Sequence, residues 1–541
     1  MNISGNIVDV LHRRIFPGTL VIEKGEITEI REEPVNTTVF ILPGFIDAHV
    51  HIESSMLIPS EFARLAVVHG TVATVSDPHE IANVLGIDGV RFMIENGKKV
   101  PFHFFFGAPS CVPATPFETS GARLGLSETE TLLRSEDIWY LSEMMNFPGV
   151  LHGDGEVLAK LRLARQYGKK TDGHAPGLRG DDAKLYARAG ITTDHECFSY
   201  EEAADKIRAG MKILIREGSA ARNFEALIPL ISEFPDQIMF CSDDKHPDDL
   251  VGGHINLLAK RAVDMGYDWM SVVRACSLVP VQHYGLPVGL LQTGDQADFV
   301  VVDSLTEMHV METWIRGIRV ASGGKSLISS VVETPVNLFL TAGLQAEDLL
   351  VPAEGNSIKV QKAIDGQLLT EVLTCEARVE QGYIQSDPDR DILKMIVLNR
   401  YHEAKPAIGF VNGFGLSKGA IASTVAHDSH NIIAVGVSDE DILEAVRLLI
   451  SAKGGVSLAS GEEKLLLPLP VAGLMSDADG YQVASRYQEL DAGAKNLGSS
   501  LRSPYMTLSF MALLVIPALK LSDKGLFDGT VFHFTDLNVR D

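Results

Sequence analysis

The strongest constraint on the fold is a pattern that recurs eight times from residue 40 onward. Each repeat is a short β-rich run that ends in a polar or charged residue, and a stretch with apolar residues at three- and four-residue spacing follows. The runs occupy residues 40–51, 71–78, 103–109, 139–145, 169–176, 190–196, 212–218 and 237–244. Equivalent positions in the middle runs lie 30 to 36 residues apart, which suits parallel strands joined by helical crossovers.

Eight such units over roughly 250 residues match the size of a (β/α)8 barrel. We therefore predict an α/β protein with this TIM-like barrel over residues 40–293. In that fold, the carboxyl ends of the strands form the active site. In this sequence those ends carry histidine, aspartate and glutamate, so the barrel also predicts where the chemistry lies.

The segments on either side of the barrel have a different character. Residues 1–39 and 294–335 read as short strands, and we predict that they pair into one small β-domain. Residues 340–541 alternate between strand-like and helix-like stretches, which indicates a C-terminal α/β domain. The predicted organisation is thus a barrel with two further domains, a reasonable number for a chain of 541 residues.

Composition narrows the class of partner. The chain has 71 acidic and 47 basic residues and a formal net charge of −24, so an acidic surface should repel nucleic acid and anionic membranes. Its five cysteines form no Cys-x-x-Cys pair, which argues against a disulfide framework or a thiolate zinc site. The N-terminus lacks an apolar signal core, and the apolar run at 510–521 is too short to span a bilayer. We expect a cytoplasmic protein.

The first run carries the clearest metal signal. His49 and His51 are separated by one residue, so on a strand their side chains point to the same face and can bind one metal ion. His174 and His195 end the fifth and sixth runs, and Asp243 ends the eighth. An aspartate there can bind metal or accept a proton from an activated water.

Four histidines and an aspartate at strand ends one, five, six and eight resemble the amidohydrolase superfamily. The resemblance implies one metal ion on His49 and His51, a second on His174 and His195, and Asp243 as a further ligand and proton carrier. It also implies a bridge from the fourth strand, for which we predict Glu143. Lys170 begins its strand about 13 Å before the strand end, too deep for a carbamylated bridge. Rival bridges are Glu118, Glu156 and Glu196.

Longer stretches resemble the bacterial adenine deaminase family over nearly the whole chain. They include PGFIDAHVHIESSM, SDPHEIANVLG, SEMMNFPGV, DGHAPGL, TTDHE, FCSDDKHPDDL, GDQADFVVVD and VAHDSHNIIAVG. The resemblance implies hydrolysis of adenine to hypoxanthine and ammonia in purine salvage. It implies two divalent metal ions, manganese or iron, with zinc as an alternative, and a homodimer.

The implied reaction needs groups around the purine ring as well as metal ligands. Two ions would lower the pKa of water, Asp243 would accept its proton, and an acid would protonate N1. The candidates for the remaining chemistry and ring contacts are His79 and Glu80, assigned to catalysis, and Ser110, Asp244 and His254, assigned to substrate binding. The motif from His427 to Asn431 is either a polar turn or a segment that reaches over the barrel mouth.

Three other interpretations are compared by the residues that each would require. A cyclic-amide hydrolase or deacetylase would carry the same metal residues. A structural relative that lost its metals should lack some of the strand-end ligands, whereas all five are present. The zinc deaminases that use His-x-Glu with Pro-Cys-x-x-Cys are excluded, because this chain has no Pro-Cys-x-x-Cys.

Overall fold

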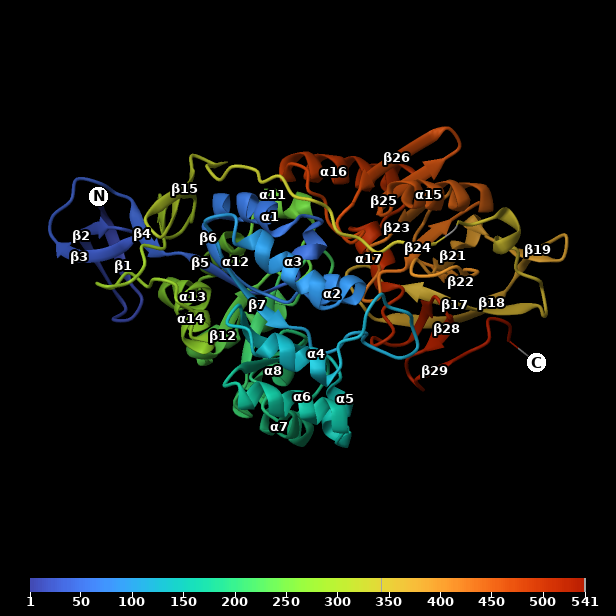
Figure 1. Cartoon of the computed structure of the whole chain (residues 1–541), viewed down its shortest axis with the longest axis horizontal. Coiled ribbons are helices and arrows are strands. Elements are labelled where there is room, and N and C mark those ends of the chain that lie inside the picture. The colour runs from blue at the N-terminus through green and yellow to red at the C-terminus, as the bar shows by residue number, and fades with distance from the viewer. Residues whose placement is uncertain (342, 540–541) are drawn as a thin grey trace.

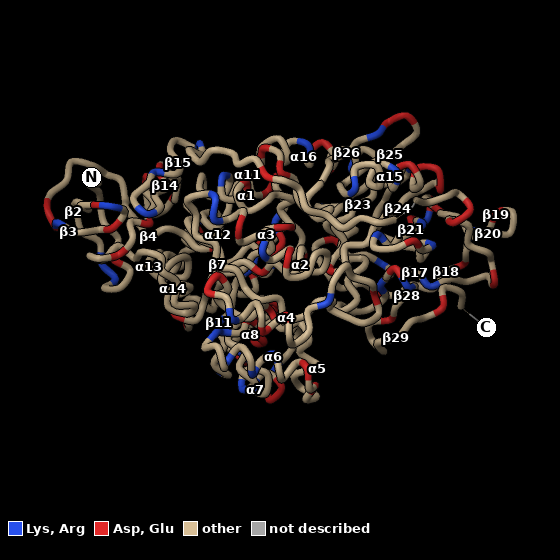
Figure 2. Tube along the Cα trace, in the orientation of Figure 1, with Lys and Arg blue, Asp and Glu red and all other residues tan. Residues whose placement is uncertain are grey.

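The computed structural model describes residues 1–341 and 343–539. The chain forms three parts in a row: a β-sheet that contains the N-terminus at one end, a barrel in the middle, and the C-terminal domain at the other end (Figure 1). Acidic and basic residues are scattered along all three parts (Figure 2), so the net charge of −24 is not confined to one of them. Among the described helices, none is both long enough and apolar enough to cross a membrane.

The middle part is the predicted (β/α)8 barrel, and the fold class is confirmed. All its strands run parallel, and the ring closes where Thr192 N–H donates to Thr171 O at 2.9 Å and His51 N–H donates to Asp243 O at 3.2 Å. The strands are β5 (Phe45–Val50), β6 (Thr71–Ser76), β7 (His103–Ala108), β8 (Ile138–Met144), β9 (Lys170–Gly173), β10 (Thr193–Asp194), β11 (Lys212–Arg216) and β12 (Ile238–Cys241).

Helices fill the crossovers, and several begin at a capping side chain. Asp154, Ser199 and Asp268 each accept a backbone N–H from the first turn of the helix that follows. The helices are α1 (Pro59–Ala66), α2 (His79–Leu85), α3 (Ile87–Gly97), α4 (Leu126–Leu133), α5 (Phe147–His152), α6 (Gly155–Gln166), α7 (Gly180–Arg188), α8 (Tyr200–Arg208), α9 (Phe224–Leu227), α10 (Leu230–Glu233), α11 (Pro247–Gly252), α12 (Ile255–Asp264), α13 (Trp269–Cys276) and α14 (Leu278–Tyr284).

The flanking segments share one eight-stranded sheet, in the order β16-β15-β14-β13-β4-β1-β2-β3. Strand β4 joins the two halves, because it pairs in parallel with β1 and antiparallel with β13. The strands are β1 (Asn2–Asp9), β2 (Arg14–Glu23), β3 (Glu26–Glu32), β4 (Phe40–Pro43), β13 (Phe299–Val302), β14 (Val310–Ile315), β15 (Ile318–Ser322) and β16 (Lys325–Ser326). Since β4 leads directly into β5, this sheet anchors the first barrel strand.

The C-terminal domain is built on a second eight-stranded sheet, in the order β18-β17-β22-β21-β24-β23-β25-β26. Helix α15 (Asp439–Ala452) packs on one face, while α16 (Gly480–Asn496) and α17 (Pro504–Phe510) pack on the other. The strands are β17 (Ser357–Ala363), β18 (Thr370–Glu376), β21 (Ile392–Leu398), β22 (Ala407–Asn412), β23 (Ala420–Ser423), β24 (Ile432–Gly436), β25 (Gly455–Ser460) and β26 (Glu463–Pro468). Smaller pairings are β19 (Arg378–Glu380) with β20 (Tyr383–Gln385), and β27 (Leu519–Ser522), β28 (Gly525–Asp528) and β29 (His533–Phe534).

The face of the C-terminal sheet that carries α16 and α17 continues into the barrel core as one apolar cluster. Polar contacts fix the same junction. Arg64 on α1 donates to Asp479 at 2.8 Å, and Asn431 after β23 donates to Thr119 O at 2.8 Å. The junction therefore brings the segment between β23 and β24 to the carboxyl ends of the barrel strands.

Candidate metal centre

Strand β5 and the residue after it supply the first two candidate ligands. The alternation of the strand directs Asp47 and His49 to one face, and His51 follows directly after its end. The Nε2 atoms of His49 and His51 lie 3.2 Å apart in a buried environment. His51 Nδ1 lies 3.2 Å from Asp77 O, a carbonyl that only accepts, so Nδ1 carries the proton and the lone pair is on Nε2.

Asp243 is the second residue after β12 and faces the same two histidines. Its backbone is left-handed (φ 54°), a conformation that aspartate tolerates better than most residues, and its N–H donates to His49 O at 3.0 Å. Asp243 Oδ1 lies 3.5 Å from His49 Nε2 and 3.2 Å from His51 Nε2. Its other oxygen, Oδ2, accepts from the Arg216 guanidinium at 2.7 Å.

Glu143, at the end of β8, lies between two groups of histidines. Its Oε1 is 3.4 Å from His51 Nε2, while its Oε2 is 2.7 Å from His174 Nδ1 and 3.2 Å from His195 Nε2. Each carboxylate oxygen thus faces a different histidine group. This is the arrangement that a ligand bridging two cations requires.

The donor set fits divalent metal ions. Buried imidazole nitrogens and carboxylates lie within 4.8 Å of one another in several overlapping groups, including His49–His195–Asp243 and Glu143–His174–His195. Imidazole and carboxylate are the usual ligands of zinc, iron and manganese. Within the described residues, His174 Nε2 is buried with no hydrogen-bond partner, so this ring also retains a nitrogen that no protein group satisfies.

Arg216 places a buried positive charge beside two carboxylates of the site. This fully buried residue ends β11 and pairs with both Glu196 and Asp243. Burial acts to raise the pKa of Asp243, but the Arg216 charge and the neighbouring histidines hold it well below its usual range. Burial opposes ionisation of Glu143 as well, and His174 and His195 keep its pKa low. Both carboxylates are therefore charged and able to bind cations.

A small cavity opens between these residues and the C-terminal domain. On the barrel side His79, Glu80 and Asp244 line it together with the candidate ligands. On the other side the lining residues are Leu368, His427, Asp428, Phe510, Leu513 and Val515. Its volume of about 30 Å³ holds about one water molecule, so a purine can enter only if lining side chains move apart.

The other two residues predicted to act in catalysis, His79 and Glu80, contact each other. His79 Nδ1 lies 3.1 Å from Asp77 Oδ2, and its Nε2 lies 3.3 Å from Glu80 Oε1. Burial acts to raise the pKa of Glu80, but His427, His79 and His430 hold it well below the usual value. Glu80 is therefore a carboxylate and has no proton to give to a substrate.

Two residues assigned to substrate binding lie outside this cavity. His254 is beneath the metal centre, where its Nε2 lies 2.8 Å from Asp47 Oδ2 and its Nδ1 lies 2.7 Å from Thr71 Oγ1. Ser110 turns away and donates to Glu143 O. Both side chains hold other parts of the site in place, so their assignment to substrate binding stays a prediction. Asp244 does line the cavity, and it accepts from Ser54 Oγ.

The three alternative bridging residues lie at different places relative to the candidate metal ligands. Glu156 is on the outer helix α6 and pairs with Arg123 at 3.2 Å, while Glu118 bonds Thr115 at 3.0 Å in the loop after β7. Glu196 does reach the site, 3.5 Å from His195 Nε2, but its carboxylate is held by Arg216. Sequence reasoning did not select Arg216, although its position at the end of the seventh run is the same kind of signal as the others.

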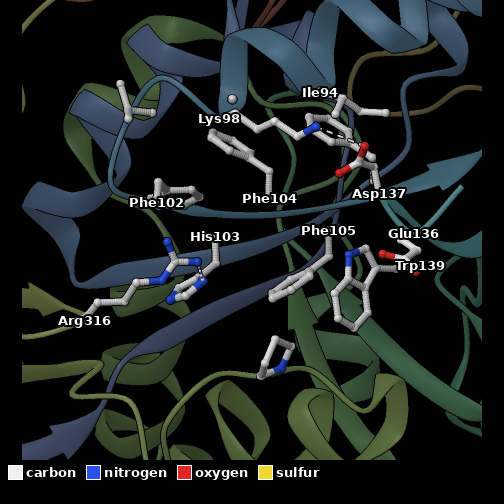
Figure 3. A pocket seen from close by; sticks show the side chains of 14 residues that line it. Ile94, Lys98, Phe102, His103, Phe104, Phe105, Glu136, Asp137, Trp139 and Arg316 are labelled. Atoms are coloured by element: carbon white, nitrogen blue, oxygen red, sulfur yellow. Dashed lines mark hydrogen bonds and ion pairs between the residues drawn. The ribbon is translucent and has the colours of Figure 1, made fainter. Parts of the chain in front are cut away.

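A second cavity lies beside the starts of β7 and β8 (Figure 3). It has a volume of about 300 Å³ and is lined by aromatic residues such as Phe105 and Trp139. Arg316 contacts His103 Nδ1 at 3.2 Å, and Lys98 donates to Asp137 at 3.0 Å. Active sites of this fold form at the carboxyl ends of the strands, so the small cavity at the strand ends is the candidate site.

Comparisons with known proteins match both the barrel and the C-terminal domain. Residues 40–327 match the amidohydrolase family, and residues 367–533 match the adenine deaminase C-terminal domain. Adenine deaminases of Salinibacter ruber and Sulfurovum are each 56% identical, over 99% of this chain and 98% and 99% of theirs. The relative from Methanosarcina mazei is 54% identical over 98% of both chains. Among solved structures, N-acetyl-D-glucosamine-6-phosphate deacetylase from Mycobacterium smegmatis has a TM-score of 0.47 and 15% identity, covering 59% of this chain and 100% of that one.

The family match and the barrel define an amidohydrolase, and its buried histidine and carboxylate clusters fit metal ions. Matches at more than half identity extend over both the barrel and the C-terminal domain. The chain belongs to the adenine deaminase family.

Proposed function

We propose that this chain hydrolyses adenine to hypoxanthine and ammonia in purine salvage, at a centre of two divalent metal ions. The observation that carries the two-metal proposal is the position of Glu143, whose oxygens face His51 on one side and His174 and His195 on the other. His49, His51 and Asp243 would hold one ion, and His174 and His195 the other. Manganese or iron, with zinc as an alternative, suits these nitrogen and oxygen ligands.

Such ions supply a water molecule of lowered pKa and stabilise developing negative charge. The protein's own groups handle the protons. Asp243 Oδ1 lies beside His49 and His51, while Arg216 fixes Oδ2, so Oδ1 would contact the ion and use its second lone pair as a base. In the proposed reaction Asp243 takes a proton from the attacking water and returns it to the amine that leaves C6. A C–O bond forms at C6, the C–N bond breaks, and the second proton of the water ends on N1 of hypoxanthine.

The direct test is turnover by metal-free protein reconstituted with manganese. We expect adenine to give hypoxanthine and ammonia in equal amounts, and chelator-treated protein to give neither. The runner-up, a cyclic-amide hydrolase, is assayed in parallel with dihydrouracil. The proposal fails if no added divalent metal supports hypoxanthine formation while the cyclic amide is hydrolysed.

The homodimer and the cytoplasmic location also remain predictions. Sedimentation of the metal-loaded protein tests the first, and fractionation of the source cells tests the second. A monomer at micromolar concentration would remove the dimer from the account without affecting the site, since every residue assigned to the metal centre comes from one chain.

A further inference from the structure

The segment between β23 and β24 places two histidines on one carboxylate of the barrel. Glu80, in the first turn of α2, contacts His427 Nδ1 through Oε1 and His430 Nε2 through Oε2. All three side chains are buried. The contact joins residues about 350 positions apart in the sequence, and it makes the C-terminal domain part of the wall of the cavity.

A metal ion is one possible occupant of this cluster, since the three side chains lie within ligand distance of one another. The hydrogen bonds of His430 argue against it. Ala426 N–H donates to His430 Nδ1 at 3.2 Å, so Nδ1 carries a lone pair and Nε2 must carry the proton. His430 Nε2 therefore donates to Glu80 and offers no lone pair to a cation. The cluster is a hydrogen-bonded clamp.

Within the clamp, His427 has a ring nitrogen without a hydrogen-bond partner among the described residues. Its Nδ1 is used by Glu80 and its ring stacks on Phe510, with centroids 4.8 Å apart and planes 16° apart. Its Nε2 is buried and has no hydrogen-bond partner among the described residues; the nearest carboxylate, Asp244 Oδ1, is 3.9 Å away. His427 lines the cavity, whereas His430 does not. A fixed ring thus presents one unsatisfied nitrogen to the space beside the metal centre.

We propose that His427 is a substrate-binding residue, contributed by the C-terminal domain, whose Nε2 hydrogen-bonds a purine ring nitrogen that is not bonded to C6, either N3 or N7. This inference rests on the proposed function, because it assumes that the ring lies in this cavity. An unsatisfied buried polar atom costs free energy, which a ligand recovers by pairing with it. Glu80 raises the pKa of His427 to about 9 against the opposing effect of burial, so Nε2 is an N–H donor at neutral pH. Purine N3 and N7 are acceptors.

The matched variants are His427→Asn, His427→Gln and His430→Asn. An asparagine amide can occupy the place of imidazole Nδ1 and keep the bond to Glu80, but it has nothing at Nε2. A glutamine amide can reach the position of Nε2. His430→Asn perturbs the same clamp at a residue outside the cavity. All are studied as full-length, manganese-loaded protein.

The measurement is calorimetric binding of 3-deazaadenine and 7-deazaadenine, each of which lacks one candidate acceptor. If Nε2 binds N3, His427→Asn should weaken binding of 7-deazaadenine, which keeps N3, by about 10- to 100-fold and leave binding of 3-deazaadenine unchanged. If Nε2 binds N7, the two analogues exchange roles. The value of kcat/KM for adenine should fall by about the same factor as the affinity for the weakened analogue. His427→Gln should recover part of the loss, and His430→Asn should weaken the two analogues equally or neither.

Equal weakening of both analogues by His427→Asn, or unchanged binding of both, would overturn the inference, as would loss of a metal ion from that variant. Each of these results would make His427 a structural residue or a metal ligand instead. The proposed function fails separately, if wild-type protein makes no hypoxanthine. Because the deaza analogues are followed by binding, the result for His427 does not depend on turnover.

Discussion

The two walls of the cavity are built in different ways. The barrel wall consists of charged side chains, such as His51, Glu143 and Asp243, held at the ends of regular parallel strands. The C-terminal wall is largely apolar, with Phe510, Leu513 and Val515 contributed by the end of α17 and the irregular chain after it. The comparison teaches that the rigid strands fix the reacting groups, while a separate domain shapes the space for the ring.

The largest effect should come from the barrel wall. His51→Ala removes a nitrogen that faces both His49 and Asp243, so we expect loss of at least one metal ion per chain. Turnover should fall by about 10³-fold or more, because metal catalysis contributes several kcal/mol. Elemental analysis and initial rates measure both. His152→Ala, at the exposed end of α5, is the control; full metal content in His51→Ala would refute the site model.

A smaller effect should follow from Arg216→Met, which leaves the metal ligands in place. Two buried carboxylates, Glu196 and Asp243, lose their cation. We expect the free energy of unfolding to fall by about 3–5 kcal/mol and turnover by about 10²-fold. Urea denaturation and initial rates test this. Arg222→Met removes a neighbouring, partly exposed arginine whose ion pairs are 4.0 Å long, and an equal effect there would contradict a special role for Arg216.

The smallest effect concerns the C-terminal wall. Buried Lys520 donates to Leu368 O at 2.8 Å and Phe510 O at 2.9 Å, and so ties together two segments that line the cavity. Burial lowers the pKa of Lys520 to about 7, below the roughly 10.4 of an unfolded lysine. Between these values the unfolded chain binds a proton that the folded chain lacks, so this residue makes stability rise with pH.

Replacing Lys520 with methionine should therefore remove a contribution of up to about 1.4 kcal/mol per pH unit between pH 7 and 10. Denaturation curves at pH 7, 8 and 9 measure it. Lys524→Met, at an exposed lysine nearby, should leave the slope unchanged. A slope that is identical in wild type and Lys520→Met would show that the pKa of this amine is not depressed.

The same contrast explains what the sequence could predict. Strand-end residues such as His49, His174 and Asp243 follow a repeating pattern, so their convergence could be foreseen from the barrel alone. Phe510 stands in an apolar run with no periodic signal, and only tertiary packing brings it to the cavity. His254 shows where the pattern stops being informative. Its polar side chain near a strand end predicts a substrate contact, whereas the structure pairs it with Asp47 and Thr71.

The central claim is that the barrel wall holds two metal ions that act together. It is tested most directly by adding manganese to metal-free protein and measuring adenine deamination against equivalents added. The arrangement around Glu143 predicts that the rate rises to a plateau at two equivalents per chain. A plateau at one equivalent, with no further change on adding the second, would contradict it.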